Sequence, residues 1–372
     1  MLSKKRILIG VLNWGLGHAV RCVPIIRYLQ TLDIEVIIAS DGQALSVLRL
    51  EFPELLSLEL PSYGISYPSE NMVWNMFWQL PRILNALRLE RLALANIIQK
   101  YKIDAYISDN RYGFYHKKIP SAFITHQLHL KIGKKWLEKG IRWLNYKLVQ
   151  RFSICWIPDD KNIGLSLSGE LSHPAAPLQR VAYMGTLSRL CGQDTAILDI
   201  KYDLLVLLSG LEPQRSILEK NIWAQALQLP HLRIAWVRGL PQNTEIAALG
   251  EASHIQTWEY AGANTLLELI HSSKTILARS GYSTLMDLQQ IGCQQLILVP
   301  TPGQTEQEYL AAHLSEQKIA YTAPQKNFNL VQALSQTVDY KGFAPKKNNS
   351  DFENTLLQFV QRIGVADSKH SP

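Results

Sequence analysis

Cysteine is scarce in this 372-residue sequence, and the patterns that build a structural cysteine site are missing. The four cysteines lie far apart, and no Cys-x-x-Cys pair occurs. This spacing excludes a disulfide framework and a cysteine-ligated zinc site, and it favours a reducing compartment.

Long hydrophobic runs are missing as well. The basic start is followed by an apolar segment that ends at Leu12, too short for a secretory signal, and no run approaches the length of a membrane span. A content of 47% hydrophobic and 19% charged residues is typical of a globular protein. We therefore expect a cytoplasmic protein, either soluble or bound peripherally to the inner face of a membrane.

The net charge of +7 is concentrated rather than spread. Residues 131–151 hold seven basic residues against the single acid Glu138. A local basic patch of this kind argues against a nucleic-acid partner.

The same segment has a helical period. Its apolar stripe, which we expect to pack on the domain, is Leu137, Ile141, Leu144 and Leu148. Trp136 and Trp143 lie on its flank, whereas Lys135, Lys139 and Arg142 cluster on another side, and Lys134 adds to the basic charge. We predict that this helix docks on an anionic membrane surface, with further contacts from Trp74, Phe77 and Trp78. The alternative is a solvated basic face with buried aromatic residues.

Strand-like and helical segments alternate along the chain, which predicts parallel sheets covered on both faces. The pattern weakens between about residues 160 and 200 and then restarts. We predict two Rossmann-like, doubly wound α/β domains at 1–165 and 201–345. Residues 166–200 form the linker, and 346–372 form a polar tail with room for one final helix.

Glycine-rich turns follow several predicted strands, at the edge where open α/β sheets bind ligands. The first turn has Gly15, Gly17 and then Val20. It lacks the third glycine of a dinucleotide fingerprint, although Asp41 keeps an NAD-binding interpretation open. Arg21 and Arg215 stand near helix N-termini, where a cation is disfavoured unless an anion lies close by.

Residues 278–312, ARSGYSTLMDLQQIGCQQLILVPTPGQTEQEYLAA, resemble the donor-binding signature of GT-B glycosyltransferases, notably family 28. That family includes the transferase that adds N-acetylglucosamine to a lipid-linked muramoyl-pentapeptide. The resemblance to UDP-glucuronosyltransferases is more distant. GLGH, YMGTLSR and FITHQL resemble further short segments of the same superfamily. The sequence departs from the family in having Asp287 where Glu is usual and Glu308 in place of the second Gln.

The resemblance implies two domains that face each other across a cleft, the first binding the acceptor and the second a UDP-sugar. The donor-binding residues that it implies are Gly15, Gly17, Arg189, Ser209, Gly210, Arg215, Tyr260, Arg279, Ser280, Gly281, Thr284, Asp287, Gln304 and Gln307. Asp287 would accept the ribose hydroxyls, and the two glutamines would contact the sugar. No Asp-x-Asp pair occurs in the chain, so we expect neither a metal site nor a cofactor beyond the UDP-sugar substrate.

His18 is our candidate for the general base that deprotonates a hydroxyl acceptor, because an imidazole titrates near neutral pH. Asp109 would orient it, and His126 is the rival base. The function that follows is an inverting, metal-independent transfer of a sugar to an acceptor that is lipid-linked or at a membrane. Three alternatives stay open: a UDP-sugar 2-epimerase-like enzyme, an NAD oxidoreductase and a non-catalytic nucleotide- or glycan-binding protein of the same fold.

Overall fold

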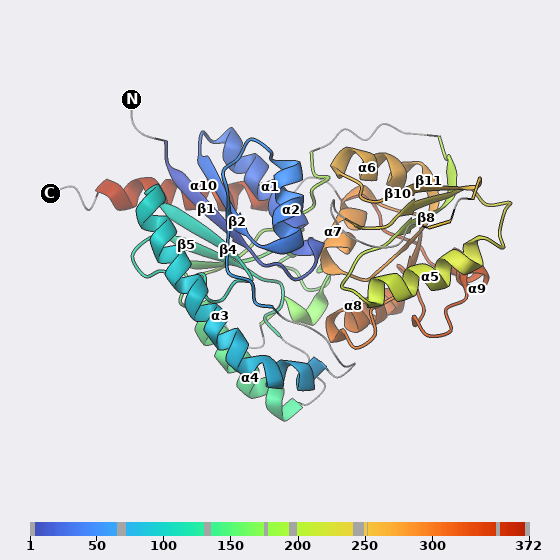
Figure 1. Ribbon diagram of the computed structural model, residues 1–372, viewed down its shortest axis with the longest axis horizontal. Helices are drawn as coiled ribbons and strands as arrows, with labels where there is room; N and C mark the ends of the chain where they lie inside the picture. Colours follow the sequence, from blue (N-terminus) through green and yellow to red (C-terminus); the bar gives the residue numbers. More distant parts are fainter. Residues whose placement is uncertain are drawn as a thin grey trace. The chain divides into compact units, whose positions relative to one another are not determined.

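The computed structural model describes residues 4–64, 72–129, 135–174, 178–192, 199–240, 249–250, 252–346 and 350–368. The chain divides into two compact units (Figure 1). The first comprises Met1–Trp14, His18–Leu187 and Asn349–Pro372, and the second comprises Gly15–Gly17 and Ser188–Asn348.

The first unit is built on a parallel sheet of seven strands in the order β3-β2-β1-β4-β5-β6-β7. Its strands are β1 (Arg6–Val11), β2 (Glu35–Ser40), β3 (Ser57–Glu59), β4 (Ala105–Asp109), β5 (Ser121–Ile124), β6 (Ile154–Ile157) and β7 (Val181–Tyr183). Its helices are α1 (Leu16–Thr31), α2 (Gly42–Glu51), α3 (Met72–Tyr101), α4 (Lys135–Val149), the short 3-10 turn η1 (Gly169–Leu171) and α10 (Ser350–Ser368).

The second unit has a parallel sheet of six strands in the order β10-β9-β8-β11-β12-β13. Its strands are β8 (Tyr202–Leu207), β9 (Ile234–Val237), β10 (Ile255–Trp258), β11 (Ser273–Ala278), β12 (Gln295–Leu298) and β13 (Tyr321–Thr322). Its helices are α5 (Gln214–Ala226), α6 (Ala263–His271), α7 (Tyr282–Ile291), α8 (Thr305–Glu316), α9 (Leu330–Gln336) and the 3-10 turn η2 (Thr337–Asp339).

Both sheets are doubly wound, as the sequence predicts. The central strands β1, β4, β8 and β11 are apolar and almost wholly buried, which is typical of parallel strands covered on both faces. Each sheet reverses its strand order once, between β1 and β4 in the first unit and between β8 and β11 in the second. Ligands of doubly wound sheets bind beyond the carboxyl ends of the strands at this reversal. The fold therefore directs attention to the residues that follow these four strands.

The boundaries of the units differ from the predicted ones. Strand β7 lies inside the predicted linker 166–200 but pairs with β6, and the first unit continues to Leu187. A strand of three residues is too short to give a periodic signal. The predicted final helix is present as α10 and is part of the first unit, where Phe359 packs against Trp156 with ring centroids 5.1 Å apart.

Helix α4 presents a different face to the core from the one predicted. Asn145 and Val149 are buried, whereas Ile141 and Leu144 of the predicted stripe are 37% and 50% exposed. Asn145 accounts for the difference, because it accepts a hydrogen bond from Tyr112 and donates one to the carbonyl of Gln127. The side chains of residues 72–78 and 135–137 lie outside the described part of the chain, as do residues 131 and 134. Among the described residues, no helix combines the length and apolar character needed to cross a membrane.

Candidate functional site

The reversal point of the first sheet carries three of the side chains that the sequence singled out. Strand β1 ends at Val11 opposite Asp109 of β4, and the turn that follows β1 leads into the first turns of α1, where His18 and Arg21 lie. Gly15 has φ +82°, a left-handed conformation that favours glycine, and it allows the chain to turn sharply into the helix.

Asp109 is fully buried and is the anion that Arg21 required. Its Oδ1 accepts a hydrogen bond from Arg21 Nε at 2.7 Å, and its Oδ2 lies 2.7 Å from Nδ1 of His18. Burial alone would raise the pKa of Asp109, but Arg21 and His18 lower it below its ordinary value. The carboxylate therefore stays ionised and fixes the orientation of the imidazole.

His18 is shielded from water but not closed off, since 15% of its side chain is exposed. Burial and the charge of Arg21 lower the pKa of His18, and Asp109 offsets part of that effect. A histidine in this state is neutral near pH 7 and is able to accept a proton.

His126 lies beyond the end of β5 and joins the same group of side chains, with its Nδ1 3.2 Å from Arg21 Nη1. The loop that carries His126 is anchored to the segment around η1, because the carbonyl of Leu171 accepts hydrogen bonds from the amides of Leu128 and His129. That segment is folded around buried Asp159, whose carboxylate accepts hydrogen bonds from three serine hydroxyls, those of Ser166, Ser168 and Ser172.

Asp41 is the residue that left an NAD-binding interpretation open. Its side chain is engaged in hydrogen bonds within the protein. Its carboxylate accepts hydrogen bonds from Asn13 and from Arg111, which is fully buried and also ion-paired with Glu90. Arg111 further donates to the carbonyls of Val11 and Pro61. This arginine, which the sequence analysis missed, ties together the ends of β1 and β2, the start of the loop after β3, and α3.

The second unit brings three turns together at its own reversal point. Ser209 and Gly210 follow β8, Arg279 to Gly281 follow β11, and Thr301 to Gln304 follow β12 and precede α8. Gly210 has φ +108° and is exposed, and a Cβ built on it would lie 3.8 Å from Thr301 Oγ1. Among the described residues, the buried hydroxyl of Thr301 has no hydrogen-bond partner. No sequence motif points to this threonine.

Several of the predicted donor-binding side chains are already engaged within the protein. Gln307 is buried, accepts a hydrogen bond from the amide of Thr301 and donates to Gln304. The hydroxyl of Ser280 donates to the carbonyl of Gln307. Gly281 caps the N-terminus of α7, and Thr284 lies half-buried in the first turn of that helix. These contacts shape the edge of the sheet, and the predicted sugar contacts stay predictions.

Asp287 also has partners inside the second unit. It is 3% exposed, and its two oxygens accept hydrogen bonds from Ser188 Oγ at 2.7 Å and Arg189 Nε at 3.3 Å. Arg189 donates to the hydroxyl of Tyr260 at 3.1 Å. Burial raises the pKa of Asp287, and the two donors lower it only in part. A contact with ribose hydroxyls would have to add to these bonds or replace one of them.

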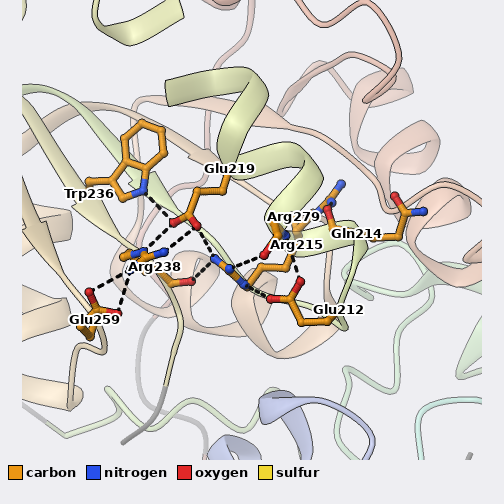
Figure 2. A network of polar contacts seen from close by, with 9 residues as sticks. Glu212, Gln214, Arg215, Glu219, Trp236, Arg238, Glu259 and Arg279 are labelled. Carbon is orange, nitrogen blue, oxygen red and sulfur yellow. Dashed lines mark hydrogen bonds and ion pairs between the residues drawn. The ribbon is translucent and has the colours of Figure 1, made fainter. Parts of the chain in front are cut away.

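A network of ion pairs underlies the carboxyl ends of β8, β9 and β10 (Figure 2). Glu219 of α5 lies 3.0 Å from Arg215 Nη1 and pairs with Arg238 at 2.8 and 2.9 Å. Arg215 also pairs with Glu212, and Arg238 with Glu259. The guanidinium of Arg215 is therefore paired with carboxylates of the protein itself. These carboxylates are the anions expected near a cation at a helix N-terminus.

Arg279 is the exception among these arginines, because its hydrogen-bond partners among the described residues are neutral oxygens. It is 1% exposed and donates to the carbonyls of Val299, Pro300 and Gln214 and to the side chain of Gln325. Burial lowers its pKa to about 9. Among the described residues, no cluster of three or more His, Cys, Asp or Glu side chains is suited to hold a metal ion.

Comparisons with solved structures show that the two units have the GT-B fold, which the chain shares with several glycosyltransferases. The calicheamicin glycosyltransferase CalG4 matches with a TM-score of 0.63 at 11% identity, over 97% of this chain and 94% of that one. MurG of Acinetobacter baumannii matches with a TM-score of 0.54 at 12% identity, over 96% and 100%. The spinosyn rhamnosyltransferase SpnG, complexed with thymidine diphosphate, matches with a TM-score of 0.58 at 10% identity, over 97% and 96%.

Residues 224–363 match the model of the glycosyltransferase family 28 C-terminal domain. A comparison with curated proteins finds no match. The matched domain and the GT-B fold together identify the chain as a glycosyltransferase similar to family 28, as the motifs of the sequence imply.

The ion-pair network predicts that loss of its central carboxylate, Glu219, strongly lowers the free energy of unfolding. Glu219→Gln removes the shared carboxylate of two arginines that are each 2% exposed, so we expect the free energy of unfolding to fall by about 3–5 kcal/mol in urea titrations at pH 7. Burial raises the pKa of Glu219, but Arg238 and Arg215 lower it overall. The carboxylate therefore stabilises the fold above its unfolded pKa. The difference from wild type should shrink below about pH 4.

Glu259→Gln is the matched control, because Glu259 pairs with the same Arg238 but its side chain is 64% exposed. We expect it to cost less than about 1 kcal/mol. Equal losses in the two variants would contradict this account of the network.

Proposed function

We propose that the protein transfers a sugar from a UDP-sugar to a hydroxyl group of a lipid-linked acceptor, with inversion at the anomeric carbon and without a metal ion. The first unit supplies the base and the acceptor site, and the second unit binds the nucleotide sugar. The pairing of His18 with buried Asp109 at the reversal point of the first sheet carries this proposal.

An imidazole that is neutral, oriented by a carboxylate and 15% exposed is suited to general-base catalysis. It accepts the proton of the acceptor hydroxyl while the oxygen attacks the anomeric carbon from the face opposite the leaving group. One base and one displacement give inversion. The bond between the sugar and the diphosphate breaks in the same step, and UDP leaves with the electron pair.

The proposed donor site lies beyond β8, β11 and β12 of the second unit. Its turns present Gly210, the start of α7 at Gly281 and the start of α8 at Gln304. Peptide N–H groups and helix N-termini favour anions, so they support binding and departure of a diphosphate. The buried, unpartnered hydroxyl of Thr301 beside Gly210 is a hydrogen-bonding group available to the ligand.

A lipid-linked acceptor is supported by the exposed face of α4 and α3. Trp143 is 60% exposed, Ile141 and Leu144 accompany it on α4, and Leu80 and Leu84 of α3 are 48% and 57% exposed. Lys139 is exposed, and Lys147 Nζ lies 3.7 Å from the centroid of the Trp143 ring. Indole, leucine and lysine on one helix are suited to the boundary between headgroups and acyl chains of anionic lipid.

The donor assignment predicts a nucleotide preference measurable by thermal shift. UDP at 100 times its Kd should add about 2.7 kcal/mol of stability, more than the same concentration of ADP or dTDP adds. Thr301→Val removes only the unpartnered hydroxyl, so affinity for the UDP-sugar should fall about tenfold while the Tm without ligand does not fall. Equal shifts with ADP and UDP would argue against the assignment.

The base assignment predicts a loss of turnover without a loss of donor binding. His18→Ala should lower kcat by about 10²–10⁴ and leave affinity for UDP nearly unchanged, because the imidazole acts on the acceptor. His116→Ala is the control and should keep full activity, because His116 lies within the β4–β5 connection, where its backbone contacts the Tyr106 hydroxyl. Normal turnover by the His18 variant, or sugar release that needs no acceptor, would overturn the proposal of transfer.

The membrane proposal predicts binding to vesicles that contain anionic lipid, weaker binding at high salt, and little binding to neutral vesicles. Trp143→Ser together with Lys139→Glu should reduce co-sedimentation several-fold. Lys220→Glu changes an exposed lysine on α5 of the second unit and serves as the matched charge control. Equal binding to both kinds of vesicle, or none to either, would refute this proposal.

A further inference from the structure

Two histidines lie at the same edge of the first sheet, and Arg21 is in contact with both. Its Nη1 lies 3.2 Å from His126 Nδ1, and its Nη2 lies 2.9 Å from His18 Nδ1. Its Nε donates to Asp109, and the side chain is 2% exposed. This geometry fixes where each imidazole carries its proton.

The tautomer of His126 follows from the chemistry of arginine. A guanidinium has N–H donors and no acceptor, so the nitrogen that faces it must offer a lone pair. Nδ1 of His126 is therefore unprotonated, and a neutral ring carries its proton on Nε2. The Nδ1 lone pair is engaged with Arg21 and is not available to accept the proton of an acceptor hydroxyl.

His18 Nδ1 lies within reach of Asp109 Oδ2 at 2.7 Å and of Arg21 Nη2 at 2.9 Å, and it cannot donate to one and accept from the other at once. If Nδ1 is protonated, it donates to Asp109 Oδ2. Arg21 Nη2 then still has an acceptor in Asp109 Oδ1, at 2.5 Å. If Nδ1 is unprotonated, Oδ2 of a fully buried carboxylate faces a lone pair, and no other described residue donates to it. The first arrangement leaves no buried acceptor without a donor, so it is favoured.

We propose that Arg21 is a positioning residue that gives the two histidines opposite tautomers and thereby selects His18 as the base. This inference rests on the proposed function. His18 carries its proton on Nδ1, held by Asp109, and presents the unprotonated Nε2. That nitrogen takes the acceptor's hydroxyl proton, and the resulting imidazolium keeps its Nδ1–H bond to the carboxylate. His126 supports Arg21 and does not exchange a proton with the acceptor.

The charge of Arg21 has a second effect, on the acidity of His18. Burial contributes most to the lowered pKa of His18, and Arg21 contributes next, with a smaller lowering from His126 and an opposing effect from Asp109. Cys22, which is also close to Asp109, has a pKa raised well above its ordinary value and stays neutral. Removing the arginine charge therefore raises the pKa of His18. The acid limb of the kcat/KM profile should then move to higher pH.

Direct observation of the tautomers is the first arm of the test. Two-dimensional ¹H–¹⁵N spectra of histidine-labelled wild-type protein without substrate should show His18 protonated on Nδ1 and His126 on Nε2, assigned with the asparagine variants below. The same tautomer on both rings, or the reverse pair, would overturn the inference. This measurement involves no turnover, so it is independent of the proposed function.

Matched asparagine substitutions form the second arm, because an asparagine amide reaches the position of Nδ1 but not that of Nε2. His18→Asn keeps a donor to Asp109 and loses the base, so kcat should fall about 10²–10⁴-fold. His126→Asn keeps an acceptor for Arg21, so kcat should stay within about tenfold of wild type. A larger loss for His126→Asn would overturn the selection of His18. Correct tautomers with normal turnover by His18→Asn would instead overturn the proposed function.

The third arm uses Arg21 itself. Arg21→Gln should shift the acid limb of kcat/KM to higher pH, and Arg21→Lys, which keeps the charge, should shift it less. A residue that served only to hold the fold would lower activity at every pH and leave the limb in place. That result would contradict the role of Arg21.

Discussion

A guanidinium taken out of water needs hydrogen-bond acceptors, and both units of this protein organise the carboxyl ends of their strands around that requirement. Five arginines that are at most 2% exposed follow these strand ends or lie in the helices that begin there, namely Arg21, Arg111, Arg215, Arg238 and Arg279. Each fixes several segments at once, because its N–H groups point in divergent directions and each needs an acceptor. A loop that would otherwise be free at the ligand-binding edge is thereby held by hydrogen bonds to charged groups.

The two units satisfy the requirement in different ways. In the first, Arg21 lies in contact with a carboxylate and two imidazoles, so the groups around it include titratable ones. In the second, Arg215 and Arg238 share Glu219, while Arg279 relies on neutral oxygens. Among the described residues, no carboxylate is therefore paired with Arg279 at the edge of the second sheet.

The sequence predicts the doubly wound sheets well because long, buried strands such as β1, β8 and β11 leave continuous apolar runs between helical periods. It misses β3, β6, β7, β10 and β13, which have two to four residues and depend on neighbouring strands for their existence. On α4 it identifies the helix but assigns the wrong face. There a single anchored amide, Asn145, outweighs the apolar stripe, and no hydropathy pattern contains that information.

The candidate site, too, is predicted only in part by the sequence. The sequence places His18 after one strand and Asp109 at the end of another. The structure pairs these strands and brings the two side chains to 2.7 Å, because a parallel sheet aligns the ends of its central strands. Position along the chain does not determine the direction of a side chain. Arg215, Gln307 and Asp287 lie in the helices that follow the predicted turns, yet each makes its hydrogen bonds inside the second unit. Glu219, Arg238 and Thr301 were missed because they belong to no local motif and meet their neighbours only in the fold.

Helix α10 belongs to the first unit although it follows the second unit in the chain, and this order has a consequence for folding during synthesis. The second unit is inserted between Leu187 and Asn349 of the first, and the last helix supplies Leu356, Phe359 and Ile363 to the first unit as buried side chains. Synthesis proceeds from the N-terminus, so the whole second unit leaves the ribosome before the first can complete its packing. Until then Trp156 lacks the ring of Phe359 against it, and the nascent first unit carries an unfilled apolar surface for the time taken to translate some 160 residues. All residues of the second unit, by contrast, precede α10 in the chain.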